Sequence, residues 1–257
     1  MLGTQLKSEW RKVSTSTMWW VVGTLIVMAN VVACAFFTFV GLNVKRSPID
    51  MNDPHAMDRL LTVGLSFSFI LPLILGMLVV NLEFHNNTIL YSLMANPTRI
   101  NLYISKLITC AVSSTFFAII SALVSLGTVI LFVSGSKYSL DVFSGQTWVT
   151  LASIVIVCAL LGVIGGAMGA LITKPLVAIV LVMLWSQVIE PIIRVVAPSE
   201  TQRLTPSSLI DASLGGGFLG QMFNVEPISQ SVALMIIMML AAVLALVGGV
   251  KFSQTEV

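Results

Sequence analysis

Six long apolar stretches determine what this chain of 257 residues can fold into. Each is long enough, at about 1.5 Å of rise per residue, to cross a hydrocarbon layer about 30 Å thick as one α-helix. Because charged residues make up only 9% of the chain, against about 25% in soluble domains, the sequence predicts an all-α integral membrane protein with six transmembrane helices. The stretches cover residues 18–42, 60–82, 107–133, 148–172, 176–197 and 228–250.

The residues before the first stretch, 1–17, predict a helix that lies in the membrane interface. Apolar residues recur there at helical spacing, and basic residues lie on the opposite side. The longer connections cover only about 43–59 and 198–227, too little for a second domain, so we interpret residues 1–257 as a single membrane domain. The two sides of the interfacial helix are Leu2, Leu6, Trp10 and Val13 against Lys7, Arg11 and Lys12.

A polar segment, residues 83–106, separates the second and third apolar stretches. It predicts a short helix with a capped start, a narrow apolar stripe and a proline at its end. Such a stripe is unprotected in water and suits a groove on a partner protein; the alternative is an amphipathic loop resting on lipid headgroups. The cap, stripe and stop are Asn87 and Thr88, then Leu90, Leu93 and Met94, then Pro97.

Basic residues give little information about orientation. With the N-terminus inside, the inner segments hold seven lysines and arginines and the outer segments hold six, so the positive-inside bias is nearly absent. The densest local group is Lys7, Arg11 and Lys12 near the N-terminus. It favours an arrangement in which both termini lie on the inner side.

The fifth stretch carries an acid and a base four residues apart, Glu190 and Arg194, with Pro191 between them. Residues at this spacing share one helical face, and ionisable groups at membrane depth usually face a cavity or a partner. One interpretation is a polar lining or gate of a translocation path. The other is an ion pair near the interface, where snorkelling lowers the cost of the charges.

The fourth stretch contains two overlapping GxxxG pairs, Gly162 with Gly166 and Gly165 with Gly169. Small residues at this spacing let helices approach closely. We expect them to serve packing within one subunit, and a seam between two subunits is the alternative.

Several kinds of chemistry have no sequence basis in this chain. No Gly-rich phosphate loop of the form G-x-x-x-x-G-K-[ST] occurs, so any ATP must be bound by another chain. No grouping of histidine, cysteine, aspartate or serine predicts a metal site or a catalytic site, and the net charge of +2 is too small to indicate a nucleic-acid partner.

The polar segment resembles the stretch that follows the second span in permeases of the ABC-2 type, the membrane subunits of one class of ATP-binding-cassette transporters. Asn87 stands where that family usually has glycine. Residues 162–174, 188–191 and 204–212 resemble further family segments. The polar residues that match the family in type and order are Glu83, Thr88, Pro97, Arg99 and Lys106. The residues that resemble the family's N-terminal elbow helix are Leu6, Glu9, Trp10 and Lys12.

The resemblance implies an exporter built from several chains. Two permease copies, or one copy with a related chain, would face each other in a bacterial inner membrane, and separate ATPase chains carrying ATP and Mg²⁺ would dock on the inner face. The polar segment would then act as an ATPase-coupling helix. The cargo expected from such apolar spans is hydrophobic or amphiphilic: a lipid, a drug or an antimicrobial peptide.

Two other functions use the same topology. A non-transporting immunity or scaffold subunit could bind a partner through the same inner helix, without cargo. An ion-coupled secondary transporter would need paired carboxylates or broken helices at the midplane and weak inverted repeats, and the sequence gives no sign of them.

Overall fold

The computed structural model describes residues 2–44, 47–85, 99–137, 144–215, 218 and 227–254. Every regular element in these residues is a helix. The elements are α1 (Leu2–Ser14), α2 (Thr17–Asn43), α3 (Ala56–Ser68), α4 (Ile70–His85), α6 (Arg99–Ser134), α7 (Gly145–Leu171), α8 (Pro175–Leu184), the π-helical turn η1 (Trp185–Ile189), α9 (Glu190–Val196), α10 (Ser199–Arg203), α11 (Pro206–Ser213) and α13 (Gln230–Gln254).

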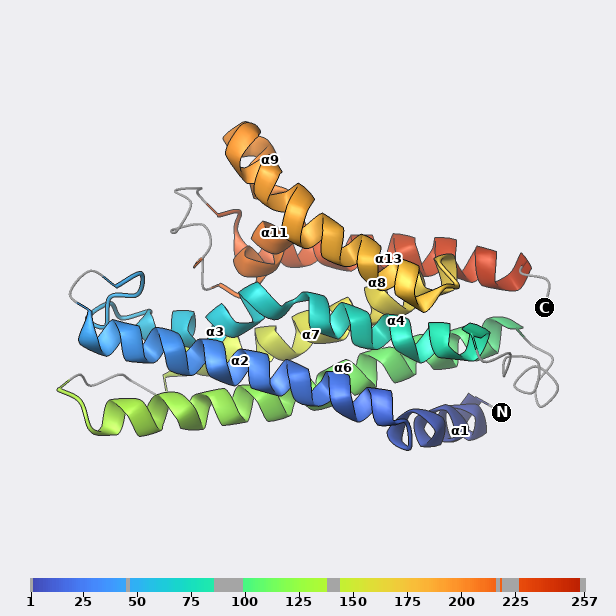
Figure 1. Ribbon diagram of the computed structural model, residues 1–257, viewed down its shortest axis with the longest axis horizontal. Coiled ribbons are helices and arrows are strands. Elements are labelled where there is room, and N and C mark those ends of the chain that lie inside the picture. The colour runs from blue at the N-terminus through green and yellow to red at the C-terminus, as the bar shows by residue number, and fades with distance from the viewer. Residues whose placement is uncertain are drawn as a thin grey trace.

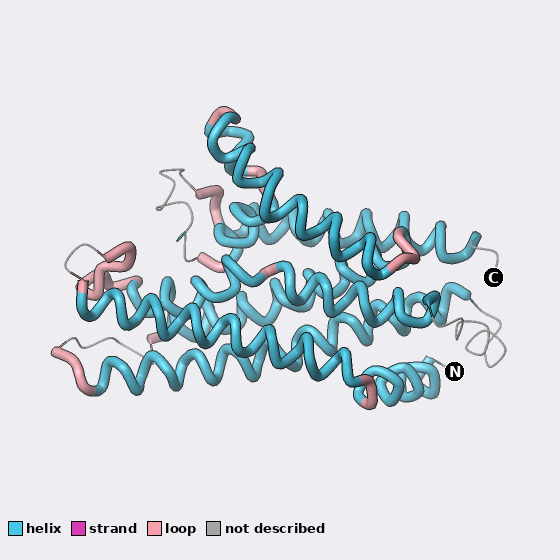
Figure 2. Tube along the Cα trace, in the orientation of Figure 1, coloured by secondary structure: helices cyan, strands magenta, loops and turns pink. Residues whose placement is uncertain are grey.

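The helices form an elongated bundle whose long members run side by side (Figure 1). Five of the described helices are long and apolar enough to cross a membrane, or six if the bent pair α3–α4 is one span. The all-helical, multi-span fold expected from the sequence is therefore confirmed. The N- and C-terminal ends lie at the same end of the bundle, and loops join the helices at both ends (Figure 2).

The second span differs from the continuous helix that the sequence analysis predicted. It consists of α3 and α4, which meet at an angle of 47°. Pro72 explains the break, because proline cannot donate to the carbonyl oxygen four residues earlier and its ring crowds that group. The carbonyl concerned belongs to Ser68, the last residue of α3, whose own hydroxyl bonds back to Gly64 O at 2.8 Å.

Two other boundaries differ from the prediction. Helix α6 begins at Arg99, eight positions before the predicted span, because the helix continues past its apolar part into the polar segment. The described part of the connection 198–227 contains two short helices, α10 and α11, where only a connection was predicted. Helix α10 follows Pro198 directly, and α11 begins with Pro206, the first helical position that proline favours.

The centre of the bundle is α7, which packs against α4, α6 and α13. Its glycines allow this. An added Cβ at Gly165 would lie 2.1 Å from the carbonyl oxygen of Leu73 in α4, and one at Gly162 would lie 2.7 Å from that of Cys110 in α6. Gly166 also faces α6, and Gly169 faces α4. The four glycines thus place α7 in direct backbone contact with two neighbours of the same chain.

The fifth span, α8–η1–α9, is the least embedded. Only 11% of its most apolar stretch is buried, against 61% for α7. In Figure 1 it rises obliquely away from the other long helices toward its α9 end. Most of its side chains therefore face outward, where lipid or another protein chain can cover them.

We predict that Gly165→Ala lowers the free energy of unfolding of the detergent-solubilised protein by about 1–3 kcal/mol or more, because α4 and α7 must separate to accommodate the methyl group. The measurement is the melting temperature. The matched control is Gly127→Ala in α6, where an added Cβ meets nothing within 4 Å and alanine improves helix propensity. Equal melting temperatures for the two variants would contradict the close packing described here.

Candidate functional site

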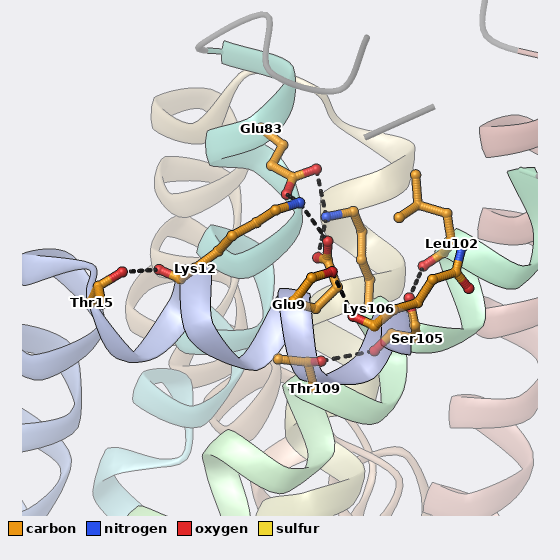
Figure 3. Close-up of polar contacts among 10 residues, drawn as sticks. Glu9, Lys12, Thr15, Glu83, Leu102, Ser105, Lys106 and Thr109 are labelled. Carbon is orange, nitrogen blue, oxygen red and sulfur yellow. Dashed lines mark hydrogen bonds and ion pairs between the residues drawn. The ribbon is translucent and has the colours of Figure 1, made fainter. Parts of the chain in front are cut away.

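Four charged side chains from three helices meet at the end of the bundle that holds both termini (Figure 3). Lys106 of α6 lies 2.7 Å from Glu9 Oε2 and 2.6 Å from Glu83 Oε2. Lys12 of α1 lies 2.6 Å from Glu9 Oε1 and 3.0 Å from Glu83 Oε1. Each ammonium group therefore contacts both carboxylates, and we call Glu9, Lys12, Glu83 and Lys106 the ion-pair cluster.

The cluster is buried most deeply on the side of α6. The side chain of Lys106 is 0% exposed, that of Glu9 2% and that of Glu83 12%, whereas Lys12 is 43% exposed at the rim. A buried charge is very costly unless it is paired and hydrogen-bonded. Two positive and two negative groups in alternation meet this requirement, so the cluster as a whole is neutral.

The pKa of Lys12 reflects both burial and pairing. Partial burial acts to lower this pKa, but the hydrogen bonds and electrostatic attraction of Glu9 and Glu83 outweigh burial and raise it above its ordinary value. Lys12 consequently remains charged at any pH near neutrality.

Local structure explains how α1 reaches the cluster. Glu9 and Lys12 are three residues apart and share one face of the helix. At the turn into α2, the indole of Trp20 donates to Ser14 O at 3.0 Å, and Trp10 packs edge-on against Trp19 with ring centroids 5.7 Å apart. These contacts fix the angle between α1 and the first span.

A second set of contacts joins the start of α6 to the end of α13. Arg99 Nη1 donates to Ser253 O at 3.1 Å, and the hydroxyl of Tyr103 donates to Ala245 O at 2.9 Å. The ring of Phe252 packs against those of Tyr103 and Phe84, with centroids 5.3 and 5.6 Å apart. Arg99 also suits the negative end of the α13 dipole.

The other end of the bundle holds a second polar group, built from Glu190, Arg194 and Ser207. Glu190 is 2% exposed. Its Oε1 accepts a hydrogen bond from the backbone amide of Ser207 at 2.8 Å and another from the hydroxyl of Ser207. Arg194 Nη2 lies 3.6 Å from Glu190 Oε1 and donates to the Ser207 hydroxyl.

Comparison with known protein families identifies a match. The sequence model described as ABC-2 family transporter protein matches residues 5–197, about three quarters of the chain. The chain belongs to the ABC-2 transporter family. It is therefore a multi-pass membrane component of a transport system, and the match indicates no catalytic domain. No curated protein matches this chain.

The family match extends from α1 to α9 and includes all four residues of the ion-pair cluster. The last part of this ABC-2 transporter protein, α10, α11 and α13, follows the matched region. No group of three or more histidine, cysteine, aspartate or glutamate side chains suited to a metal ion occurs in the part of the chain that the structure describes.

The structure brings together residues that the sequence analysis treated separately. Glu9 and Lys12, from the predicted elbow helix, pair with Glu83 and Lys106, from the predicted coupling segment. Leu6 and Trp10 are half-buried in α1. The predicted coupling residues Asn87, Thr88, Leu90, Leu93, Met94 and Pro97 lie outside the described residues.

Sequence reasoning missed Ser207, Tyr103 and Phe252. Ser207 lies in a segment interpreted as a connection, Tyr103 lies within the polar segment 83–106, and Phe252 follows the sixth predicted span. A usable signal did exist for part of the ion-pair cluster: Glu83 and Lys106 each lie next to an apolar stretch, where an unpaired charge is costly. It indicated that these charges need partners without indicating which ones.

We predict that Lys106→Met destabilises the protein by about 3–5 kcal/mol, because it leaves Glu9 and Glu83 as buried carboxylates with only Lys12 as a shared counter-charge. The measurement is thermal unfolding in detergent. Lys7→Met, at an exposed position of α1, is the matched control and should change stability by less than about 0.5 kcal/mol.

A double variant separates pairing from general packing. If the cluster acts as a unit, Glu9→Gln combined with Lys106→Met should cost less than the sum of the two single variants. Simple additivity would contradict the coupling of these charges.

Proposed function

We propose that this chain is the permease subunit of an ATP-driven exporter that moves a hydrophobic or amphiphilic cargo with energy from a separate ATPase chain. The observation that carries the proposal is the ion-pair cluster. Glu83 and Lys106 lie on the two sides of residues 86–98, the segment in which the sequence predicts the coupling helix. Glu83 pairs with Lys12 of α1, and Lys106 pairs with Glu9 of α1. Three elements near the proposed docking face are thus tied at one point.

The cluster offers a physical route for coupling. A partner that displaces residues 86–98 acts on α4 at Glu83 and on α6 at Lys106. Because both side chains share the counter-charges of α1, a displacement of α4 or α6 alone would strand buried charges. Movement of the three helices together keeps every charge paired. The proposed stroke therefore enters the membrane through α4 and α6 and carries the elbow helix with them.

The composition of the spans supports an apolar cargo. Outward-facing side chains of α2, α6, α8 and α13 are mostly large and apolar, and charged residues make up only 9% of the chain. Ionisable groups inside the membrane are typical of ion pathways and proton relays, and the spans carry few of them. We propose a lipid, a hydrophobic drug or an antimicrobial peptide as the cargo class, moved outward.

The proposed complex contains two permease chains, identical or related, and ATPase chains that hold ATP and Mg²⁺. Both termini of the permease would lie in the cytoplasm and the spans in a bacterial inner membrane. The weakly buried fifth span and α13 leave enough apolar surface for lipids and for the second permease chain.

The test is purification of the tagged chain from its native membrane in mild detergent, followed by identification of what remains bound. We expect a soluble ATPase at about one copy per permease. A chain that is isolated alone, even after cross-linking, would instead support a non-transporting immunity or scaffold subunit.

We further predict that replacing Leu90, Leu93 and Met94 together by aspartate releases the ATPase, since charges on the apolar stripe cannot enter an apolar groove. The spans should remain folded, as judged by size-exclusion chromatography. Leu204→Asp is the control, because Leu204 is an exposed leucine at the other end of the molecule. Retention of the ATPase by the triple variant would contradict the docking role of residues 86–98.

A further inference from the structure

The buried residues of the fifth span follow an unusual spacing. Ala178, Val182 and Glu190 are buried, and Ser186 is half-buried, so the inward positions recur every four residues. A regular α-helix turns by about 100° per residue. Over the twelve positions from Ala178 to Glu190 it would rotate the inward face by about 120°, and Glu190 would point away from the bundle.

The π-helical turn η1 corrects this rotation. It covers Trp185–Ile189 and closes with a hydrogen bond from the amide of Glu190 to Trp185 O, five residues earlier. A π turn accommodates one extra residue, so the rotation of Glu190 from Ala178 falls to about 20°. The wider turn therefore places a carboxylate on the face that packs against the rest of the chain.

Pro191 gives a local reason for the turn. Proline has no amide hydrogen to donate, and its ring crowds the carbonyl four residues earlier, here that of Gln187. The π turn ends two residues before Pro191. The sequence Trp185–Pro191 thus encodes a weak point in the fifth span, and π turns of this kind often occur at functional sites.

Glu190 then stabilises a helix that has no cap of its own. Helix α11 begins at Pro206 after Thr205, whose side chain makes no capping hydrogen bond. The carboxylate of Glu190 supplies the missing acceptor for the Ser207 amide at 2.8 Å, and a negative charge suits the N-terminal end of a helix. The fifth span is therefore attached to α11 through a cap contributed from outside the helix.

Helix α11 is also held from two other sides. Ser66 of α3 donates to Asp211 Oδ1 at 2.8 Å, and the side-chain amide of Gln230, at the start of α13, donates to Ser213 O at 3.1 Å. In Figure 1, α11 lies between the α9 part of the fifth span and the beginning of α13. Three spans meet at this short helix through polar contacts.

The cap is incompletely satisfied. Glu190 Oε2 is buried and has no hydrogen-bond partner among the described residues. An unsatisfied buried carboxylate oxygen costs free energy in the closed arrangement and regains water when the contact opens. This reduces the net free energy needed to separate Glu190 from Ser207.

From these contacts we infer that Glu190 is a positioning residue of a gate: its carboxylate latches the fifth span to α11, and η1 is the hinge about which α9 swings when the latch opens. The latch rests on contacts within this chain, and its role in cargo release rests on the proposed transport function. The rest of the fifth span has few packing contacts to resist such a movement.

The experiment measures access to α11 in the full-length chain reconstituted in lipid nanodiscs. Ala212 of α11 is 5% exposed, and Ala212→Cys serves as a reporter for a hydrophilic maleimide. The native cysteines Cys34, Cys110 and Cys158 are buried, and the chain without the reporter gives the background rate. A second reporter, Ala118→Cys in α6, detects general unfolding, because the native Ala118 is only 1% exposed.

Glu190→Ala should raise the labelling rate at position 212 by about tenfold, since a hydrogen bond to a charged group changes an equilibrium by that factor or more. Glu190→Gln retains an oxygen that can accept a hydrogen bond from Ser207. Its labelling rate should therefore fall between those of the Glu190→Ala variant and the wild-type protein. The matched control is Glu200→Ala on α10, an acid whose side chain is 79% exposed, which should leave the rate unchanged.

Equal labelling rates for Glu190→Ala and Glu200→Ala would overturn the latch. Faster labelling at both reporters would also overturn it, because Glu190 would then support the whole fold and not this contact. The nanodisc measurement needs no ATPase, so it decides the latch even if the proposed transport function is wrong. In an isolated complex that hydrolyses ATP, an unchanged rate on adding ATP would overturn the gate role and leave the transport function standing.

Discussion

The buried alternation of charge among Glu9, Lys12, Glu83 and Lys106 is the interaction on which the arrangement of this protein depends. Buried ion pairs add little net stability compared with well-packed apolar groups, but breaking one partner out of a pair is very unfavourable. Such a cluster therefore selects one arrangement of its helices more than it strengthens them. Here the cluster holds α1, α4 and α6 against one another. It lies beside the segment that joins α4 to α6.

The two ends of the bundle are held by different chemistry around a common centre. At the centre, glycines of α7 bring backbones into contact with α4 and α6, and close packing of this kind resists deformation. At one end, full charges are almost completely paired. At the other end, a carboxylate, hydroxyls and backbone amides hold a short helix, with one carboxylate oxygen left unsatisfied. The first end is suited to moving as a unit and the second to opening.

Hydropathy predicted the all-helical, multi-span fold because the length and composition of an apolar stretch of about 20 residues decide whether it can cross a membrane, and these do not depend on tertiary contacts. The pairing of the cluster could not be predicted this way: Lys12 and Glu83 are 71 positions apart, and Glu9 and Lys106 are 97 apart. Glu190 and Arg194 could be placed on one face from their spacing alone. Their partner Ser207 could not be predicted, because it lies 17 residues after Glu190 and helix α10 intervenes.

The break in the second span could have been predicted, since Pro72 stands inside an apolar stretch and its effect on the preceding turn is general. It was missed because hydropathy averages over the stretch and does not register one residue. Pro191, noted in the sequence between Glu190 and Arg194, indicates a local opening of the fifth span for the same reason. Prolines within spans therefore deserve separate attention when a membrane sequence is interpreted.

The bend of 47° between α3 and α4 has a mechanical consequence. Helix α4 ends at the ion-pair cluster through Glu83, and α3 reaches α11 through the bond from Ser66 to Asp211. One interrupted span therefore connects the two ends of the molecule. A straight helix would transmit a displacement along its own axis only. With the bend, an axial displacement of α4 reaches α3 partly as a displacement across the axis of α3.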